Sequence, residues 1–175
     1  MTIRPAKSSD LPFFRRLYRE AFPRSERKPV SMLRREVKRG RMEMLILCEG
    51  DAPVGLIVTA ICAEPVLIDY FAIEPSMRGR GLGSHALDAI RSYYGGKPLF
   101  LEIEAPDPAA PNQAQRLSRK RFYERCGFLD TGHRVRLMGI PMELLSSAPV
   151  TRNACRHAYE VLYGKWVGRI VKLEE

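Results

Sequence analysis

The fold of this chain is indicated most clearly by residues 68–84, which read IDYFAIEPSMRGRGLGS. An apolar segment is followed by a proline-marked break, a basic glycine-rich turn and an amphipathic helix expected over Ser84–Tyr94. Glycines at every second position leave the turn with few side chains, so successive backbone N–H groups can converge on one anion. The start of the helix adds unpaired amides and the positive end of its dipole. The stretch therefore predicts a phosphate-binding turn between a strand and a helix.

Two familiar phosphate-binding motifs do not match this turn. A P-loop requires four residues between its first glycine and a Gly-Lys-Ser/Thr, and no such run follows. A dinucleotide-binding fold requires Gly-x-Gly-x-x-Gly after its first strand. This turn reads Gly-x-Gly-x-Gly and lies near the middle of the chain. The pattern that is present is Arg-x-x-Gly-x-Gly, at Arg78, Gly81 and Gly83.

Together with the strand before it and the segment FYERCGF at residues 122–128, this turn resembles the acetyl-CoA pyrophosphate loop of the GNAT acetyltransferase superfamily. The resemblance covers residues 2–145 and implies an α/β fold with a central mixed β-sheet of six to seven strands flanked by helices. It implies a GNAT domain over residues 1–145 and a helical C-terminal extension over 146–175. That extension is expected to pack on the domain, to contribute to a dimer or to form a lid on the acceptor side.

Hydrophobic periodicity and turn residues predict the other elements. Helices are expected over residues 8–22, 30–39, 112–126 and 151–163, and strands over 2–6, 42–49, 53–62, 65–73, 98–105, 134–139 and 142–145. Ser8 or Ser9 is the expected N-cap of the first helix. This order of elements is that of the GNAT fold.

Composition limits the class of protein. A chain of 175 residues, 45% hydrophobic and 28% charged, is expected to form one soluble domain. No apolar run reaches the ~18–20 residues that span a bilayer, and no signal peptide is evident at the N-terminus. The four cysteines, Cys48, Cys62, Cys126 and Cys155, are widely spaced, so we expect reduced thiols in a cytoplasmic protein with no metal site. The net charge of +9 leaves three explanations open: attraction to an acidic partner, attraction to nucleic acid, or solubility alone.

The resemblance implies where acetyl-CoA binds. Its pantetheine arm would pair with the strand edge at Phe71, Ala72 and Ile73, since an unpaired edge offers donors and acceptors to an added chain. Its pyrophosphate would lie on the backbone of the turn, whose members are Arg78, Gly79, Arg80, Gly81, Leu82, Gly83 and Ser84. Arg78 would be the charged clamp. The family often has an asparagine seven residues before its helix tyrosine; here Arg116 occupies that position, so the contact falls to Asn112 or to an arginine–phosphate pair.

Acetyl transfer to an amine requires a neutral nucleophile. A lysine-like amine of pKa ~10.4 needs about 4–5 kcal/mol to lose its proton at pH 7. Asp69 and Glu104 are the candidate bases, with a water chain or no dedicated base as the alternative. Asp69 shares a strand face with Phe71 if alternation holds. An ion pair with one of the many arginines is the structural alternative for Asp69.

Tyr123 matches the tyrosine of the family's Tyr-x-x-x-Gly-Phe signature, and its phenol can donate to the departing thiolate. Packing on Phe128 is the alternative role. Glu26, between the first two helices, is a candidate ligand for a cationic amine, or a helix-capping carboxylate.

The resulting hypothesis is an acetyl-CoA-dependent N-acetyltransferase that acts on a primary amine of a small molecule or protein. The alternative is a non-catalytic acyl-CoA-binding sensor or complex subunit. The expected partners are acetyl-CoA and an amine acceptor, in a monomer or homodimer. A membrane is not expected as a partner, because no apolar run is long enough to span one. Nucleic acid is not expected either, because no RNA-binding motif or zinc-finger spacing is present.

Overall fold

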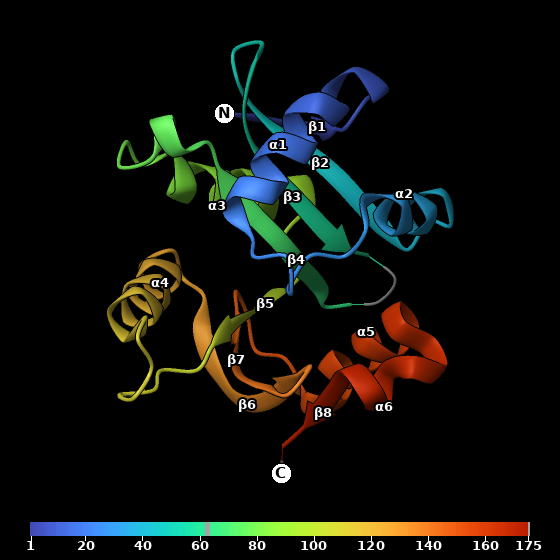
Figure 1. Ribbon diagram of the computed structural model, residues 1–175, viewed down its shortest axis with the longest axis vertical. Coiled ribbons are helices and arrows are strands. Elements are labelled where there is room, and N and C mark those ends of the chain that lie inside the picture. The colour runs from blue at the N-terminus through green and yellow to red at the C-terminus, as the bar shows by residue number, and fades with distance from the viewer. Residues whose placement is uncertain (62–63, 175) are drawn as a thin grey trace. The chain divides into compact units, whose positions relative to one another are not determined.

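The computed structural model describes residues 1–61 and 64–174 (Figure 1). Cys62, predicted as the end of a strand and as a reduced thiol, lies outside the described residues. The chain falls into two compact units. Residues 1–61 and 68–96 form the first, here called the N-terminal unit, and residues 62–67 and 97–175 form the second, the C-terminal unit.

The predicted mixed sheet flanked by helices is confirmed, but it has eight strands rather than six to seven. Their order is β1-β2-β3-β4-β5-β7-β6-β8. The additional strand is β8 (Val171–Leu173), which lies in the segment predicted to be helical and pairs with Val135–Leu137. Three residues are too short for a sequence pattern to predict, and Val171 is buried only because this pairing places it in the core.

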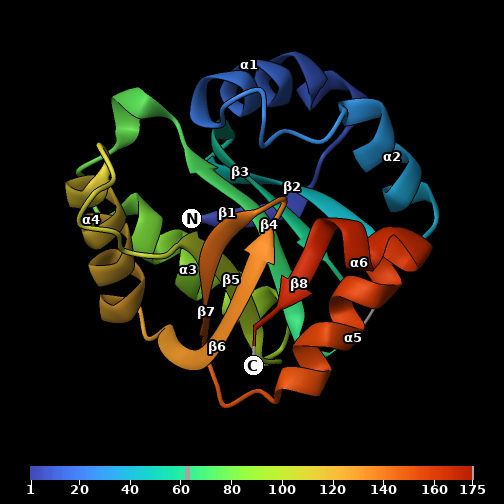
Figure 2. The same ribbon diagram turned by 60° about the horizontal axis from the view of Figure 1, so that its bottom comes forward.

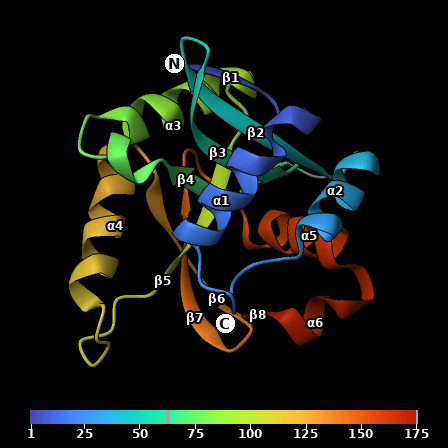
Figure 3. The same cartoon turned by 45° about the horizontal axis from the view of Figure 1, so that its top comes forward.

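The N-terminal unit holds the first half of the sheet and the helices around it (Figure 3). Its elements are β1 (Thr2–Pro5), η1 (Ser8–Asp10), α1 (Leu11–Ala21), α2 (Val30–Lys38), β2 (Met42–Glu49), β3 (Ala52–Ala60), β4 (Val66–Ile73), η2 (Pro75–Met77) and α3 (Leu82–Tyr93). β2 pairs antiparallel with both β1 and β3. The first two residues of β4 are counted with the C-terminal unit, in which the Val66 amide donates to Pro98 O.

The start of α1 differs from the prediction that a serine caps it. Ser8–Asp10 form a separate 3-10 turn, and the α-helix begins at Leu11. The Asp10 carboxylate accepts from the Lys7 amide and from Arg4 at 2.6 Å each, and it thereby ties the turn to β1. The apolar face of α1 is buried as its periodicity predicts, through Phe14, Leu17 and Tyr18.

The C-terminal unit holds the second half of the sheet (Figure 2). Its elements are β5 (Leu99–Glu104), α4 (Gln113–Arg125), β6 (Leu129–Leu137), β7 (Ile140–Ser146), α5 (Arg152–Tyr163), η3 (Gly164–Trp166), α6 (Val167–Ile170) and β8. β7 pairs antiparallel with β5 and β6. β6 begins five residues earlier than predicted because an irregularity between Asp130 and Arg134 interrupts its alternation. The ring of Tyr159 on α5 packs edge-on against Phe100 of β5, with centroids 5.9 Å apart.

Candidate active site

The glycine-rich turn joins β4 to α3 through the short helix η2. Gly79 and Gly81 have φ of +75° and +76°, a conformation that side chains other than glycine rarely adopt, and Gly81 is the N-cap residue of α3. An added Cβ would meet nothing within 4 Å at either position, so the surface over the turn is open. The amides of Ser84 and His85 already donate to Gly81 O. The earlier amides of the helix are of the kind that an α-helix leaves without an internal acceptor.

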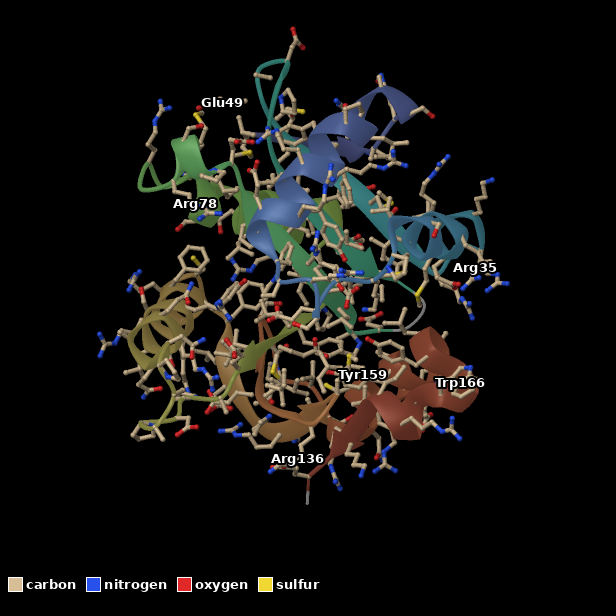
Figure 4. All side chains as sticks on the ribbon, viewed as in Figure 1. Arg35, Glu49, Arg78, Arg136, Tyr159 and Trp166 are labelled. Atoms are coloured by element: carbon tan, nitrogen blue, oxygen red, sulfur yellow. The ribbon has the colours of Figure 1, made fainter. Side chains whose placement is uncertain are left out.

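Two arginines, Arg78 and Arg80, belong to this turn, and both are exposed. The Arg78 Nε donates to Ile73 O at 3.1 Å, so its guanidinium is held beside the end of β4. Figure 4 shows Arg78 at the start of the turn. Arg80 contacts Met77 Sδ at 3.3 Å. The turn thus presents backbone amides, a helix N-terminus and two cations in one short segment, which is a suitable arrangement for a phosphate group.

β4 alternates as predicted where it approaches the turn. Tyr70 and Ala72 are buried on one face, and Asp69 and Phe71, each less buried as a whole residue, share the other face. Ile73 follows on the face of Asp69 and Phe71 and is buried. Among the residues predicted to pair with pantetheine, Ala72 and Ile73 also lie against β3, where Gly55 makes room for them.

Asp69 forms a close ion pair with Lys28. The Lys28 Nζ donates to both carboxylate oxygens, at 2.5 and 2.7 Å, and 5% of the Asp69 side chain is exposed. The partner is thus a lysine, whereas the predicted alternative was an arginine. The charge of the Asp69 carboxylate is therefore already balanced by an adjacent ammonium group.

An aromatic cluster fixes the loop between α1 and α2 on β4. The Tyr70 ring lies 4.9 Å from the rings of both Tyr18 and Phe22, edge to face. Its hydroxyl donates to Glu26 O at 2.7 Å and accepts from the Lys28 amide at 3.1 Å. Burial raises the pKa of Tyr70, so the phenol stays protonated and keeps donating. Through this bond Glu26 is held at the loop by its carbonyl; a role for its carboxylate in binding an amine stays a prediction.

In the C-terminal unit, Glu104, Asn112 and Arg116 form a closed hydrogen-bonded triangle. Arg116 donates to Glu104 and to Asn112 at 2.9 Å each, and Asn112 donates to Glu104 at 3.3 Å. Arg116 also donates to Ala105 O at 2.8 Å, and Arg119 lies 3.5 Å from the other Glu104 oxygen. The structure thus brings these three predicted residues together, where they tie the start of α4 to the end of β5.

Tyr123 lies in the last turns of α4 among aromatic rings. Its ring is 5.1 Å from that of Phe122 and 6.0 Å from that of Phe128, both at steep angles. Its carbonyl accepts from the Phe128 amide, which closes the end of the helix. Burial raises the pKa of the Tyr123 phenol to about 12, so this group carries its proton at neutral pH.

The predicted site residues thus form two groups, one in each unit. Glu26, Asp69, residues 71–73 and the turn belong to the N-terminal unit, and Glu104, Asn112, Arg116 and Tyr123 to the C-terminal unit. Lys28 and Arg16 were not predicted from the sequence: Lys28 is 41 residues from its partner Asp69, and Arg16 forms two hydrogen bonds to Glu74 across 58 residues. No local pattern predicts such pairs; only the excess of cations indicated that some carboxylates would be paired.

Two other features are absent from the described residues. They contain no group of three or more His, Cys, Asp and Glu side chains with the arrangement of a metal site. They also contain no helix long and apolar enough to cross a membrane.

Comparison with known proteins gives a family and a set of similar structures. A model of the acetyltransferase (GNAT) family matches residues 11–128. No curated protein matches the chain. A solved structure assigned to the GNAT acetyltransferases, from Bacteroides thetaiotaomicron, is 24% identical, with a TM-score of 0.78, and the match covers 94% of this chain and 99% of that one.

Two further structures are similar at lower identity. Arabidopsis thaliana Naa50, in complex with the bisubstrate analogue CoA-Ac-MVNAL, is 16% identical with a TM-score of 0.61, over 84% of this chain and 97% of that one. Vibrio cholerae spermidine N-acetyltransferase, in complex with CoA and spermine, is 17% identical with a TM-score of 0.60, over 83% of this chain and 93% of that one. These likenesses support the fold alone. The family model, however, spans about two thirds of the sequence, including the glycine-rich turn and Tyr123, and therefore this chain belongs to the GNAT family of acetyltransferases.

Proposed function

We propose that this protein transfers the acetyl group of acetyl-CoA directly to a primary amine of a small molecule or a protein. The observation that carries the proposal is the turn between β4 and α3. There, two glycines in the left-handed conformation alternate with two exposed arginines and lead directly into the N-terminus of α3, whose first backbone amides are presented at the same place. The Naa50 and spermidine N-acetyltransferase structures contain CoA or a CoA analogue, which supports the choice of coenzyme.

Acetyl-CoA would be held along β4 and at the turn. The pyrophosphate accepts hydrogen bonds from the amides before Ser84, and Arg78 adds a full charge. Pantetheine is proposed to pair with the backbone of Phe71, Ala72 and Ile73. Because β4 is an interior strand of the sheet, this pairing requires that the end of β4 leave some of its backbone groups unpaired. An arginine–phosphate contact from Arg116 is not supported, because its guanidinium already donates to Glu104, Asn112 and Ala105.

In the reaction, the neutral amine attacks the thioester carbonyl. A C–N bond forms, the C–S bond breaks, and CoA leaves as a thiolate that takes one proton while the amine loses another. Tyr123 is proposed to supply the proton or a strong hydrogen bond to the sulfur, since its phenol is protonated at neutral pH. Asp69 and Glu104 both face cations. Water is therefore the acceptor that we propose for the proton of the amine.

The second candidate function is an acyl-CoA-binding sensor without chemistry. The pairing of both candidate carboxylates favours it, because each already accepts hydrogen bonds from a cation. Release of free CoA thiol, followed over a panel of amines, separates the two. An enzyme releases CoA in proportion to added amine, whereas a sensor binds acetyl-CoA and releases none.

The turn makes a first prediction. Replacing Gly81 by valine is expected to raise the dissociation constant of acetyl-CoA at least tenfold, or about 1.4 kcal/mol. A β-branched residue at φ +76° is strained, and relief of the strain moves the amides away from the phosphates. Calorimetric titration with acetyl-CoA measures the change. The matched control is Gly50→Val in the turn between β2 and β3, where φ is +60° and space is equally open. Equal affinities of the two variants for acetyl-CoA would contradict the proposal that the turn after β4 binds the pyrophosphate.

Tyr123 makes a second prediction. Tyr123→Phe is expected to lower kcat about 100-fold while the dissociation constant of acetyl-CoA changes little. The substitution removes only the hydroxyl and leaves the ring against Phe122 and Phe128. Steady-state kinetics with binding measured in parallel tests it. If binding is lost instead of turnover, Tyr123 is a packing residue and the proton comes from another group.

A further inference from the structure

Positive charge is concentrated in residues 11–41. This segment consists of α1, α2, the loop between them and the three residues after α2. It holds eleven arginines and lysines and three glutamates, and so carries +8 of the net charge of +9. The rest of the chain is close to neutral. General solubility would not require such a distribution.

Several cations of the segment lie on the surface. The exposed ones on the two helices are Arg15, Arg16 and Arg19 on α1 and Arg34, Arg35, Lys38 and Arg39 on or directly after α2. Figure 4 shows Arg35 at the outer face of α2. The one carboxylate of α2, Glu36, is buried and paired with Arg35, Arg39 and Arg41. It therefore balances only one of these three positive charges.

Some of these cations form no ion pair with any carboxylate that the structure describes. Within residues 1–61 and 64–174, no ion pair involves Arg15, Arg19, Arg34 or Lys38. Arg34 and Lys38 border a groove of about 400 Å³ beside α2, to which Lys7 contributes a third cation and Val37 and Met44 an apolar surface. The segment thus offers unpaired cations at a recessed surface.

The same segment is attached to β4. Arg16 donates to both oxygens of Glu74 at 2.9 and 2.8 Å, at the end of the strand. Lys28 pairs with Asp69, and the loop carbonyl of Glu26 accepts from Tyr70. The segment that carries the unpaired cations is therefore also in direct contact with β4, along which the thioester is proposed to lie.

This surface discriminates between classes of amine. A polyamine carries several positive charges, and like charges repel it. The α-amine of a polypeptide has a pKa of about 8, so roughly one molecule in ten is neutral at pH 7, against about one in 2,500 for a lysine-like amine of pKa ~10.4. Nearby cations increase the neutral fraction of a bound amine. An amino terminus thus needs less help from a base, which is consistent with the pairing of Asp69 and Glu104.

We propose that the α1–α2 cationic surface docks an acidic polypeptide segment whose own amino terminus is the acetyl acceptor. The inference rests on the proposed function and specifies its substrate class. Carboxylates that follow the first residue pair with Arg34, Lys38 and the other unpaired cations, and this pairing places the α-amine at β4.

Nucleic acid is the other polyanion that such a surface attracts, and the structure favours the peptide. A nucleic acid carries no aliphatic amine to accept the acetyl group. Its single strands are held by aromatic rings on which bases stack. The four aromatic residues of the segment are engaged elsewhere: Phe14, Tyr18 and Phe22 pack with one another and Tyr70, and Arg16 lies over the ring of Phe13.

The test compares synthetic peptides with free amino termini by CoA release. The first peptide has aspartate and glutamate after its first residue, and its twin has asparagine and glutamine at the same positions. We expect kcat/KM at least tenfold higher for the acidic peptide, and we expect the difference to shrink as salt screens the charges. Arg34→Glu/Lys38→Glu is expected to abolish the difference. The control Arg156→Glu/Lys172→Glu makes the same change in net charge at exposed positions of the C-terminal unit and is expected to retain it.

The outcomes separate this inference from the proposed function. If the amide peptide or spermidine is acetylated as well as the acidic peptide, the protein is an N-acetyltransferase but the docking proposal is wrong. If a single-stranded oligonucleotide binds the native protein tightly and the Arg34/Lys38 variant weakly, while the two peptides react equally, the surface binds nucleic acid. If acetyl-CoA binds but no amine of the panel releases CoA, both proposals fail and the sensor is favoured.

Discussion

Replacing Lys28 by methionine is expected to lower the free energy of unfolding by about 3–5 kcal/mol. The substitution removes the ammonium group that lies 2.5 and 2.7 Å from the two oxygens of Asp69. Because only 5% of the Asp69 side chain is exposed, water cannot replace the lost partner fully. A buried carboxylate stripped of its cation is destabilising to this extent even where the intact pair contributes little. Chemical denaturation, followed by fluorescence or circular dichroism, measures the change.

Two further variants make the result specific. Lys38→Met removes an exposed cation that has no ion pair within the described residues, and we expect a change within about 0.5 kcal/mol. The double variant Lys28→Met/Asp69→Leu removes both charges and is expected to regain most of the lost stability. If Lys28→Met and Lys38→Met unfold at the same denaturant concentration, the pair is not the buried interaction described above.

The Lys28–Asp69 pair also decides the role of Asp69 in catalysis. If Asp69 only balances Lys28, then kcat/KM of Asp69→Asn has the same pH dependence as that of the native protein. The value of kcat/KM itself falls at every pH, because the substitution leaves Lys28 without its partner. A limb of the pH–rate profile that disappears in Asp69→Asn would assign the proton of the amine to this carboxylate.

The second large effect is expected at Gly55 of β3. Gly55→Ala should lower the free energy of unfolding by about 3 kcal/mol, because an added Cβ would lie 2.7 Å from Ala72 O and 2.8 Å from Leu47 Cδ1. The side chain of Leu47 can adjust, but the backbone oxygen of β4 moves only with the strand. The shift would also disturb Ala72 and Ile73, the residues proposed to pair with pantetheine, so affinity for acetyl-CoA should fall with stability.

Thermal denaturation of Gly55→Ala tests this prediction. For a chain of this size, 1 kcal/mol corresponds to roughly 2–4 °C, so the melting temperature should fall by roughly 6–12 °C. The control is Gly168→Ala in α6, where an added Cβ meets nothing within 4 Å and no positive φ is involved. Alanine there is expected to leave stability unchanged or slightly raised. Equal melting temperatures for the two alanine variants would show that β3 and β4 do not approach as closely as described.

The sequence predicted the elements that depend on neighbouring residues. The turn after β4 was predicted because its glycines are two residues apart, and the structure gives Gly79 and Gly81 the left-handed conformation that only glycine adopts easily. The periodicity of α1 predicted its buried face correctly, through Phe14, Leu17 and Tyr18. The predicted serine cap of α1 was wrong, because the helix begins at Leu11 without a side-chain cap and Asp10 instead accepts from the Lys7 amide before it.

Other features depended on contacts that no local pattern contains. Asp69 and Glu104 were both read as candidate bases, since a carboxylate in a strand has the same sequence signature whether it is paired or not. Lys28 pairs with Asp69 across 41 residues, and Arg116 pairs with Glu104 across 12 residues. β8 was missed because three residues form a strand only when β6 offers them an edge.

For this protein, then, sequence alone determined the glycine-rich turn, the order of the helices and strands up to α5 and the family to which they belong. Backbone conformation at a glycine or a helix end is decided within a few residues, and so can be read from them. Tertiary structure alone decided which charges are neutralised and which stay available to a ligand. Those pairings follow from the packing of distant segments, and the balance between eleven cations and three carboxylates in residues 11–41 acquires its meaning only once their partners are known.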